Sequence, residues 1–173
     1  MKALTAALLV FVAACGKGNV ILNVDVLSFL SASDSTKAYA ILGTGTFDST
    51  ISRRFTMPPG FGNSSVDSVT ATVASSLENA TGAGSVILEV FFAQTQGGLF
   101  TGTPFLADSS GPVSGVQTVP LGKSSLPLSD PIFNSDSLWV GIRARLTTTT
   151  APMSGQLRFT DIHLRIVLQD NIL

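Results

Sequence analysis

The chain has 173 residues, enough for one domain with a sizeable hydrophobic core. Only 12% of the residues are charged, against about 25% in typical globular proteins, and Ser, Thr and Gly supply much of the remaining polarity. Ten basic and eleven acidic residues give a net charge of −1, so the composition lacks the basic excess that marks nucleic-acid-binding proteins. A single cysteine excludes an internal disulfide, so packing alone must hold the fold together.

The first sixteen residues have the layout of an export signal. Lys2 precedes an apolar run, residues 3–14, that only Thr5 interrupts. A charged start and a short apolar core ending in small residues are typical of secretory signals. The run is also shorter than the ~20 residues that a membrane-spanning helix needs. We therefore expect an exported protein.

The end of this run carries a more specific pattern. Val12-Ala13-Ala14-Cys15 resembles the lipobox of bacterial lipoproteins, in which an apolar residue and two small residues precede the cysteine that becomes the lipidated N-terminus. The apolar position is more often Leu than Val in that family. The resemblance implies acylation of Cys15, and several acyl chains anchor a protein stably where a single chain does not. The alternative is a plain secretory signal followed by a buried cysteine.

The resemblance also implies boundaries and a location. Residues 1–14 would be the signal peptide, residues 15–18 the lipid-anchored N-terminus with a short tether, and residues 19–173 a single domain close to the membrane surface. Neither Gly16 nor Lys17 is the Asp that favours inner-membrane retention in lipoproteins of enteric bacteria, so the resemblance implies the outer membrane. Loss of Lys2 would leave nine basic and eleven acidic residues, a net charge near −2.

Alternation of apolar and polar residues with period two predicts strands through most of the remaining chain. Residues 19–30 and 67–77 alternate regularly, with Pro58-Pro59-Gly60 ending a further strand at 50–57. Residues 86–93 are apolar on both faces apart from Glu89, which is typical of a central strand. Weaker strands are expected at 37–42 and 113–121, with loops at 78–84, 94–112 and 122–136, and a short edge strand at 104–107 within the second of these loops.

The last two strands, 138–146 and 157–168, have the strongest alternation and are expected to form a hairpin through residues 147–155. Their apolar phase slips by one residue between Phe159 and Ile162, which indicates a β-bulge near Thr160-Asp161. No segment after Gly16 shows a helical period. Seven to nine strands predict an all-β fold, an antiparallel β-sandwich of immunoglobulin-like or jelly-roll type.

The outward face of this expected hairpin holds the best candidate site. Its members are the basic residues of the last two strands: Arg143, Arg145, Arg158, His163 and Arg165. Such a face could bind an anionic partner, such as lipid headgroups, an acidic polysaccharide or a protein surface. The alternative is a solvated face neutralised by Asp161, Glu89 or Asp25 on neighbouring strands.

The sequence gives no pattern for catalysis or for a metal. His163 is the only histidine and lies two residues from Asp161, but no G-x-S-x-G or S-x-x-K motif supplies a nucleophile. Zinc would need three or four ligands that the chain does not space correctly. Asp130, Asn134 and Asp136 could offer oxygen ligands to Ca²⁺, but they are also ordinary turn formers. We therefore predict no catalytic residues, no metal and no cofactor.

These observations favour a non-enzymatic, lipid-anchored envelope protein that acts as a binding or structural module. Its partners would be the membrane, through the anchor, and a polysaccharide or a protein of unknown identity. One alternative is a subunit of a surface assembly joined by strand addition, suggested by the long C-terminal strand. A carbohydrate-binding or hydrolytic sandwich is a weaker alternative, because the chain has one Trp, one Tyr and only two Glu residues.

Overall fold

The structure of the protein is a computed structural model that describes residues 18–56, 65–135 and 137–170. The proposed signal peptide, the lipobox and Cys15 lie outside the described residues, as do Asp136 and the end of the expected strand at 50–57. The elements are β1 (Gly18–Asp25), η1 (Leu27–Phe29), α2 (Ala32–Ser35), β2 (Thr36–Ile41), β3 (Gly45–Thr56), β4 (Ser65–Ala93), η3 (Gln96–Gly98), β5 (Leu106–Ser109), β6 (Val113–Ser114), β7 (Gln117–Ser124), η4 (Pro131–Asn134) and β8 (Ser137–Asp170).

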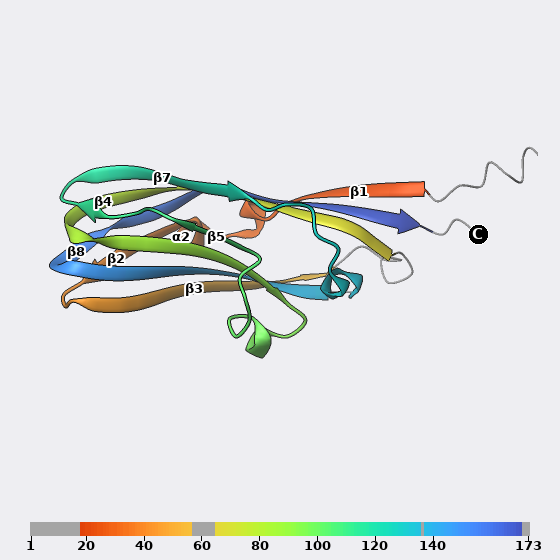
Figure 1. The fold of residues 1–173 in the computed structure, drawn as a ribbon, viewed down its shortest axis with the longest axis horizontal. Coiled ribbons are helices and arrows are strands. Elements are labelled where there is room, and N and C mark those ends of the chain that lie inside the picture. The colour runs from red at the N-terminus through yellow and green to blue at the C-terminus, as the bar shows by residue number, and fades with distance from the viewer. Residues whose placement is uncertain (1–17, 57–64, 136, 171–173) are drawn as a thin grey trace, which may run out of the picture.

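All the strand pairs are antiparallel, and they link eight strands into one hydrogen-bonded sheet. The sheet folds into two layers because β4 and β8 both turn a corner and contribute one segment to each layer. Residues 65–79 of β4 pair with residues 155–169 of β8 in the first layer, and residues 83–93 pair with residues 139–150 in the second. Figure 1 shows the layers stacked, with both corners at the end of the molecule away from β1.

The strand order identifies the topology. In the first layer, β7 borders β4 and both β1 and β2 border β8. In the second layer, β5 and β6 border β4, while β3 borders β8. Each layer therefore has β4 and β8 at its centre, and the remaining strands flank this central pair. This is the double Greek key of a jelly roll. The expected all-β antiparallel sandwich is confirmed, and the jelly-roll form of it is the one observed.

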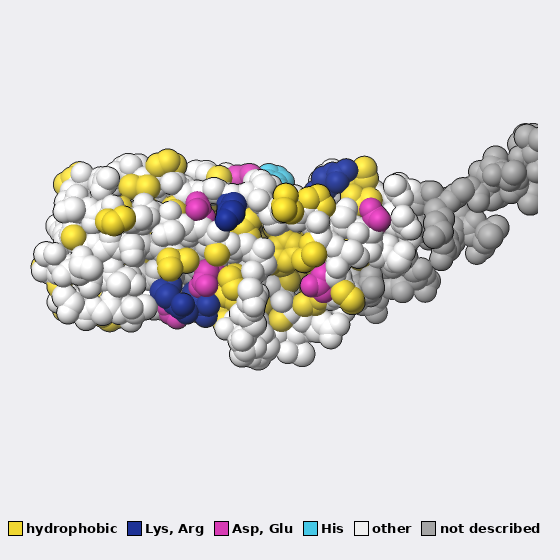
Figure 2. Space-filling model, viewed as in Figure 1, with side chains coloured by type: hydrophobic (Ala, Val, Ile, Leu, Met, Phe, Trp, Pro, Cys, Tyr) yellow, Lys and Arg dark blue, Asp and Glu magenta, His cyan; other side chains and the backbone are white. Residues whose placement is uncertain are grey.

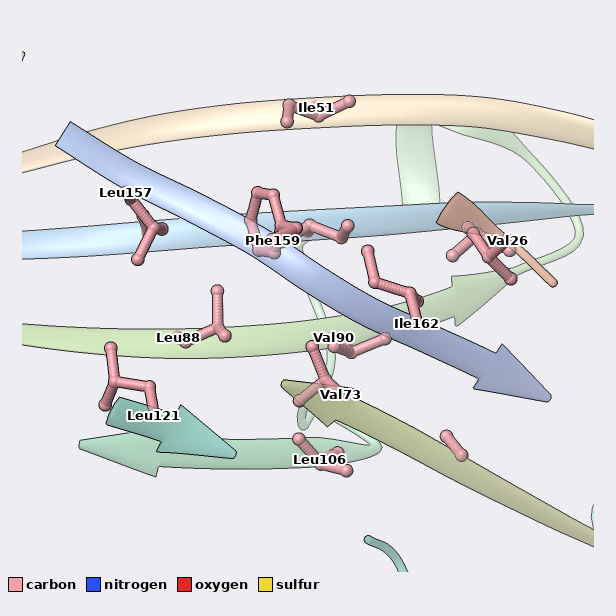
Figure 3. Close-up of a cluster of buried hydrophobic side chains, with 14 of the residues drawn as sticks. Val26, Ile51, Val73, Leu88, Val90, Leu106, Leu121, Leu157, Phe159 and Ile162 are labelled. Atoms are coloured by element: carbon pink, nitrogen blue, oxygen red, sulfur yellow. The ribbon is translucent and has the colours of Figure 1, made fainter. Parts of the chain in front are cut away.

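The core lies between the layers and consists of the inward side chains of both (Figure 3). Leu88 and Val90 of the second layer face Val73 and Phe159 of the first, and each of these four side chains is at most 4% exposed. Full burial of such a side chain contributes roughly 1.5–3 kcal/mol. The alternating pattern of the sequence therefore becomes a two-layer fold because each layer covers the apolar face of the other.

The expected bulge in the last strand is confirmed. Ala74 pairs with Asp161 and Ser75 pairs with Phe159, so Thr160 is the extra residue. The bulge returns both Phe159 and Ile162 to the core. The expected loops at 78–84 and 147–155 were wrong, because the backbone stays paired around both corners. β1 ends at Asp25 rather than near residue 30, and η1 follows it.

A buried polar contact holds the corners together. The Tyr39 hydroxyl donates to Asn79 Oδ1 at 2.9 Å, and Asn79 Nδ2 donates to the carbonyl oxygen of Gly115 at 2.7 Å. Asn79 is only 3% exposed, so these bonds satisfy groups that burial would otherwise penalise. Gly155 is required beside them, since a Cβ there would lie 2.1 Å from the carbonyl oxygen of Glu78. The contact links β2 to the corner of β4 and to the turn before β7.

Burial raises the pKa of Tyr39 to about 12, which gives the first prediction. Because the folded-state pKa lies above the unfolded value, the contribution of the phenol to stability is complete below about pH 10 and is lost as the pH rises towards 12. Tyr39 is the only tyrosine, so the ultraviolet absorbance of tyrosinate reports it alone. We expect this absorbance to rise near pH 12 while the protein stays folded. A midpoint near 10 in the folded protein would contradict the buried contact.

Candidate functional site

The structure separates the five predicted basic residues into two groups. Arg143 and Arg145 lie on the second-layer segment of β8, whereas Arg158, His163 and Arg165 lie on its first-layer segment. The two segments pair with β4 and not with each other, so their outward faces point to opposite sides of the sandwich. The expected single basic face on a hairpin was therefore wrong, although binding of an anion by either group stays a prediction.

Arg143 is fixed in a partly buried ion pair. Its Nε lies 2.6 Å from Glu89 Oε2, and the exposed fractions of the two side chains are 14% and 10%. The guanidinium carbon lies 4.7 Å from the centre of the Phe91 ring, in cation–π geometry. These contacts explain how Glu89 is tolerated in an otherwise apolar central segment.

Residues 94–105 cover this ion pair from outside. Leu99 and Phe100 form a second apolar cluster with Phe91 on the outer face of the second layer, and the rings of Phe91 and Phe100 meet edge to face. Arg143 also donates to the Phe100 carbonyl oxygen at 3.5 Å. Gly141 lies beneath the same segment, where a Cβ would come within 2.6 Å of Leu99 Cδ2. Arg143 thus helps to position a loop through its contacts within the chain.

Three of the other basic residues also have acidic neighbours. Arg145 Nε lies 3.1 Å from Asp48 Oδ1, which raises the pKa of Arg145. Arg158 Nε lies 3.9 Å from Glu78 Oε1, and His163 Nδ1 contacts Asp161. The alternative given above was a face whose basic residues are neutralised by acidic ones such as Asp161, and the contact of His163 with Asp161 agrees with it. Exposed pairs of this kind contribute at most about 1 kcal/mol each.

Arg165 is the exception. It is exposed and forms no ion pair or side-chain hydrogen bond within the part of the chain that the structure describes. In register it lies between Asn23 of β1 and Thr70 of β4, on the outer face of the first layer. Of the five predicted residues, it is therefore the one best placed to meet an anionic partner.

The sequence did not reveal an ion cluster around Asp34. This carboxylate contacts both Lys37 and Arg53, which lie on different strands. Hydrogen bonds from Lys37 and Ser31 lower the pKa of Asp34. The ion pair between Asp34 of α2 and Arg53 of β3 could not be predicted from the sequence. Nothing in the sequence around a charged residue identifies a partner that lies 19 residues away.

Two apolar hollows are candidate binding sites. One, of about 260 Å³, opens between the layers at the end that holds the termini. The other, of about 510 Å³, lies along the edge between β5 and β7, and apolar side chains gather in the middle of the face in Figure 2. Leu126 and Leu128 beside this second hollow are 86% and 51% exposed. The first hollow is lined by Leu22, Asn23, Val24, Phe29, Phe55, Thr56, Leu138, Leu164 and Ile166.

Among the residues that the structure describes, the end of the molecule opposite β1 carries no charged side chain. The connections 42–47, 79–86, 110–119 and 146–155 meet there, and none contains Asp, Glu, Lys or Arg. Figure 2 shows this end without acidic or basic side chains on the visible face. Hydroxyl groups pair across it, as in the contact between Thr81 and Ser154 at 2.8 Å. An uncharged, hydroxyl-rich end suits hydrogen bonding to a neutral surface.

Within the described residues there is no group of three or more His, Cys, Asp or Glu side chains that could hold a metal ion. Asp130, one of the possible calcium ligands, accepts a hydrogen bond from the backbone N–H of Ile132 at the start of η4. Its proposed co-ligand Asp136 lies outside the described residues. No helix in the described ranges has the length and apolarity needed to cross a membrane.

No protein-family model matches the sequence, and no curated protein matches it significantly. Among solved structures, 88% of the chain is similar to 32% of a chain in the structure of infectious bursal disease virus Gx strain, with 7% identity and a TM-score of 0.48. Similarly, 86% of the chain aligns with 86% of TmCBM61, solved in complex with β-1,4-galactotriose, with 8% identity and a TM-score of 0.35. In the structure of the infectious bursal disease virus VP2 subviral particle, 87% of the chain aligns with 37% of the viral chain, with 10% identity and a TM-score of 0.35.

The chain thus spans about a third of the length of the viral chains that it matches. With identities of 7–10% and TM-scores below 0.5, these likenesses carry no argument about function.

The geometry of Arg143 predicts unequal effects of two similar substitutions. Arg143→Ala would leave Glu89 buried without a partner and should lower the free energy of unfolding by about 3–5 kcal/mol. Arg145→Ala removes an exposed pair on the same strand and should leave the free energy of unfolding nearly unchanged, because solvent screens the pair. Urea unfolding of both variants measures the difference. Equal, small losses would show that Arg143 does not hold the loop.

Proposed function

We propose that this chain is a lipid-anchored, non-enzymatic β-sandwich module of a bacterial envelope, which binds or supports another envelope component. The observation that carries the proposal is the lipobox-like sequence Val12-Ala13-Ala14-Cys15 directly ahead of the first strand. A cysteine three residues before a folded domain can join that domain to a membrane with almost no intervening tether.

The fold is compatible with such an anchor. β1 begins at Gly18, so the expected tether contributes its last residue to the sheet. The three residues from Cys15 to Gly18 can span at most about 10 Å, which would hold this end of the domain at the bilayer surface. Gly18 pairs with Asp170, so both ends of the described chain lie at this end. The uncharged end lies at the other end of the domain from the anchor, where partners can reach it.

The acidic residues support a binding or structural role over hydrolysis. Glu78 and Glu89 are the only glutamates, and they lie in different layers, each beside an arginine. A glycoside hydrolase needs two carboxyl groups on either side of one substrate bond, whereas these two serve ion pairs within the sheets. The apolar hollow between β5 and β7 and the uncharged end are instead suited to contact with a protein or a polysaccharide.

An outer-membrane location completes the proposal. It rests on the residues that follow Cys15, because neither Gly16 nor Lys17 is the aspartate associated with inner-membrane retention. It is separable from the anchor itself, since acylated Cys15 could be found in either membrane.

The proposal predicts a modified N-terminus. Mass spectrometry of the full chain expressed in a bacterium should show loss of residues 1–14 and a diacyl or triacyl mass on Cys15. Cys15→Ser should lack this mass and leave the membrane fraction, because a lipid anchor holds a protein to a bilayer through its acyl chains. Fractionation of the two membranes tests the location. An unmodified Cys15 in a protein that is exported and folded would contradict the anchor.

A further inference from the structure

The outer edge of β1 has unpaired backbone groups. The Val26 N–H donates to the Ile162 carbonyl oxygen at 2.8 Å, and the pairing of β1 with β8 keeps one register from Gly18 to Asp25. Hydrogen-bonded and non-hydrogen-bonded pairs alternate along antiparallel strands. Val20, Leu22 and Val24 therefore bond to β8, whereas the N–H and C=O groups of Asn19, Ile21 and Asn23 point away from it. No other strand of the described chain pairs with that side.

The other long edge strands carry charges or a proline within their length, whereas β1 carries a charge only at its last residue, Asp25. β3 has Asp48, Arg53 and Arg54, and β7 has Pro120 and Lys123. Charges and prolines of this kind are common protections of sheet edges. β2 and β5 are shorter, with six and four residues, and each contains a charged residue as well.

From Gly18 to Val24, β1 has no charged residue, no proline and no register shift. Val20 and Ile21 are 43% and 49% exposed. A regular, uncharged and apolar edge of this length is a template for another strand. The opposite edge of β1 is occupied by β8, so a new strand can join on one side only.

We propose that two copies of this chain pair through their β1 strands, antiparallel and centred on Ile21. In this register Ile21 faces its own copy, Val20 faces Leu22, and Asn19 faces Asn23. The segment Asn19-Val20-Ile21-Leu22-Asn23 thus reads nearly the same in both directions, which a symmetric antiparallel pair requires.

The backbone geometry fits the same register. Ile21 is one of the residues whose N–H and C=O groups point to the free edge, so the two copies of Ile21 would exchange both hydrogen bonds across the symmetry axis. Asn19 and Asn23 would do the same with each other on either side of the axis. A register shifted by one residue would oppose groups that already bond to β8. The alternation along β1 therefore selects registers in which odd-numbered residues face odd-numbered residues, and the near-palindromic order of the side chains favours the one centred on Ile21.

The free edge also ends where this pairing ends. The outward carbonyl oxygen of Asp25 accepts a hydrogen bond from the Ser28 hydroxyl at 2.8 Å, and Asp25 Oδ1 accepts from the Ser28 N–H at 3.2 Å. η1 thus closes the edge after Val24. The first layers of two copies would join into one continuous sheet, with the two domains pointing in opposite directions from the axis.

The C-terminal strand cannot fill this role. Residues 163–170 of β8 lie between β1 and β4, so the strand that suggested strand addition from the sequence is paired on both sides within one copy. The inference goes beyond the proposed function and does not depend on acylation of Cys15, since it concerns only the edge of the folded domain.

A charge at the symmetry axis tests the proposal. Ile21→Lys would bring two ammonium groups together across the axis, because like charges directly opposite each other in a sheet are unfavourable. We expect the full chain in mild detergent to be a dimer by light scattering and Ile21→Lys to be a monomer. Val116→Lys is the matched control, since Val116 is 90% exposed in the turn before β7 at the other end of the molecule, and it should stay dimeric. A monomeric parent protein, or equal behaviour of the two variants, would overturn the proposal.

A second pair of variants tests the register and cannot be explained by misfolding alone. Asn19→Asp with Asn23→Lys would place opposite charges against each other twice, whereas Asn19→Lys with Asn23→Lys would place like charges there. Both positions are exposed, and both variants carry the same new lysine beside Arg165. The first should remain dimeric, and the second should dissociate at least about tenfold more readily at low salt. Equal dissociation of the two variants would overturn the register centred on Ile21.

Discussion

The backbone pairing between β4 and β8 is the interaction on which the structure depends. These two strands lie side by side in both layers, and every other strand borders one of them. Because both strands turn a corner at the same end, a single pair of neighbours creates two sheets whose apolar faces point at each other. The core, the layer edges and the separation of the two ends of the molecule all follow from this arrangement. A chain without disulfides can hold such a fold because the pairing is continuous around the corners.

The charged residues serve this framework more than they form a site. Arg143 and Glu89 occupy the outer face of the second layer, where residues 94–105 leave them only 14% and 10% exposed. Burial of two charges is tolerable only when they are paired and hydrogen-bonded, and the ring of Phe91 adds a favourable contact. Arg145 and Arg158 make exposed pairs with acids on neighbouring strands. The surfaces left for recognition are therefore apolar hollows, the uncharged end and the edge of β1.

The sequence indicates which face of each strand is buried, but it does not indicate which strands pair with each other. The alternation of apolar and polar residues shows which side chains point inward, so the all-β class and the central segment around Glu89 could be predicted. The slip in this alternation predicted the bulge near Thr160-Asp161. Nothing in the alternation says which strands pair, however. The last two strands were therefore expected to form a hairpin, although each of them pairs with β4 and neither pairs with the other. The acidic partner of Arg145 is 97 residues away in the sequence, and such a contact has no local signal.

The same gap explains why the long C-terminal strand suggested strand addition. Strong alternation and a terminal position describe a strand but not its place in a sheet, and β8 proved to be central. The sequence of β1 has no feature that distinguishes it from the other strands. Its importance comes from its place in the sheet, because among the described strands it pairs only with β8. Its near-palindromic order becomes meaningful only when the structure shows which backbone groups are free.

Residue-resolved amide hydrogen exchange of the folded protein is the most direct test of this arrangement. Amides protected by pairing exchange slowly, and those facing solvent exchange quickly. Along residues 163–170 of β8, slow exchange at successive residues is expected, because β1 and β4 bond alternate amides from opposite sides. Fast exchange at every second residue of this segment would show that β8 lies at an edge, and would contradict the central place of the β4–β8 pair.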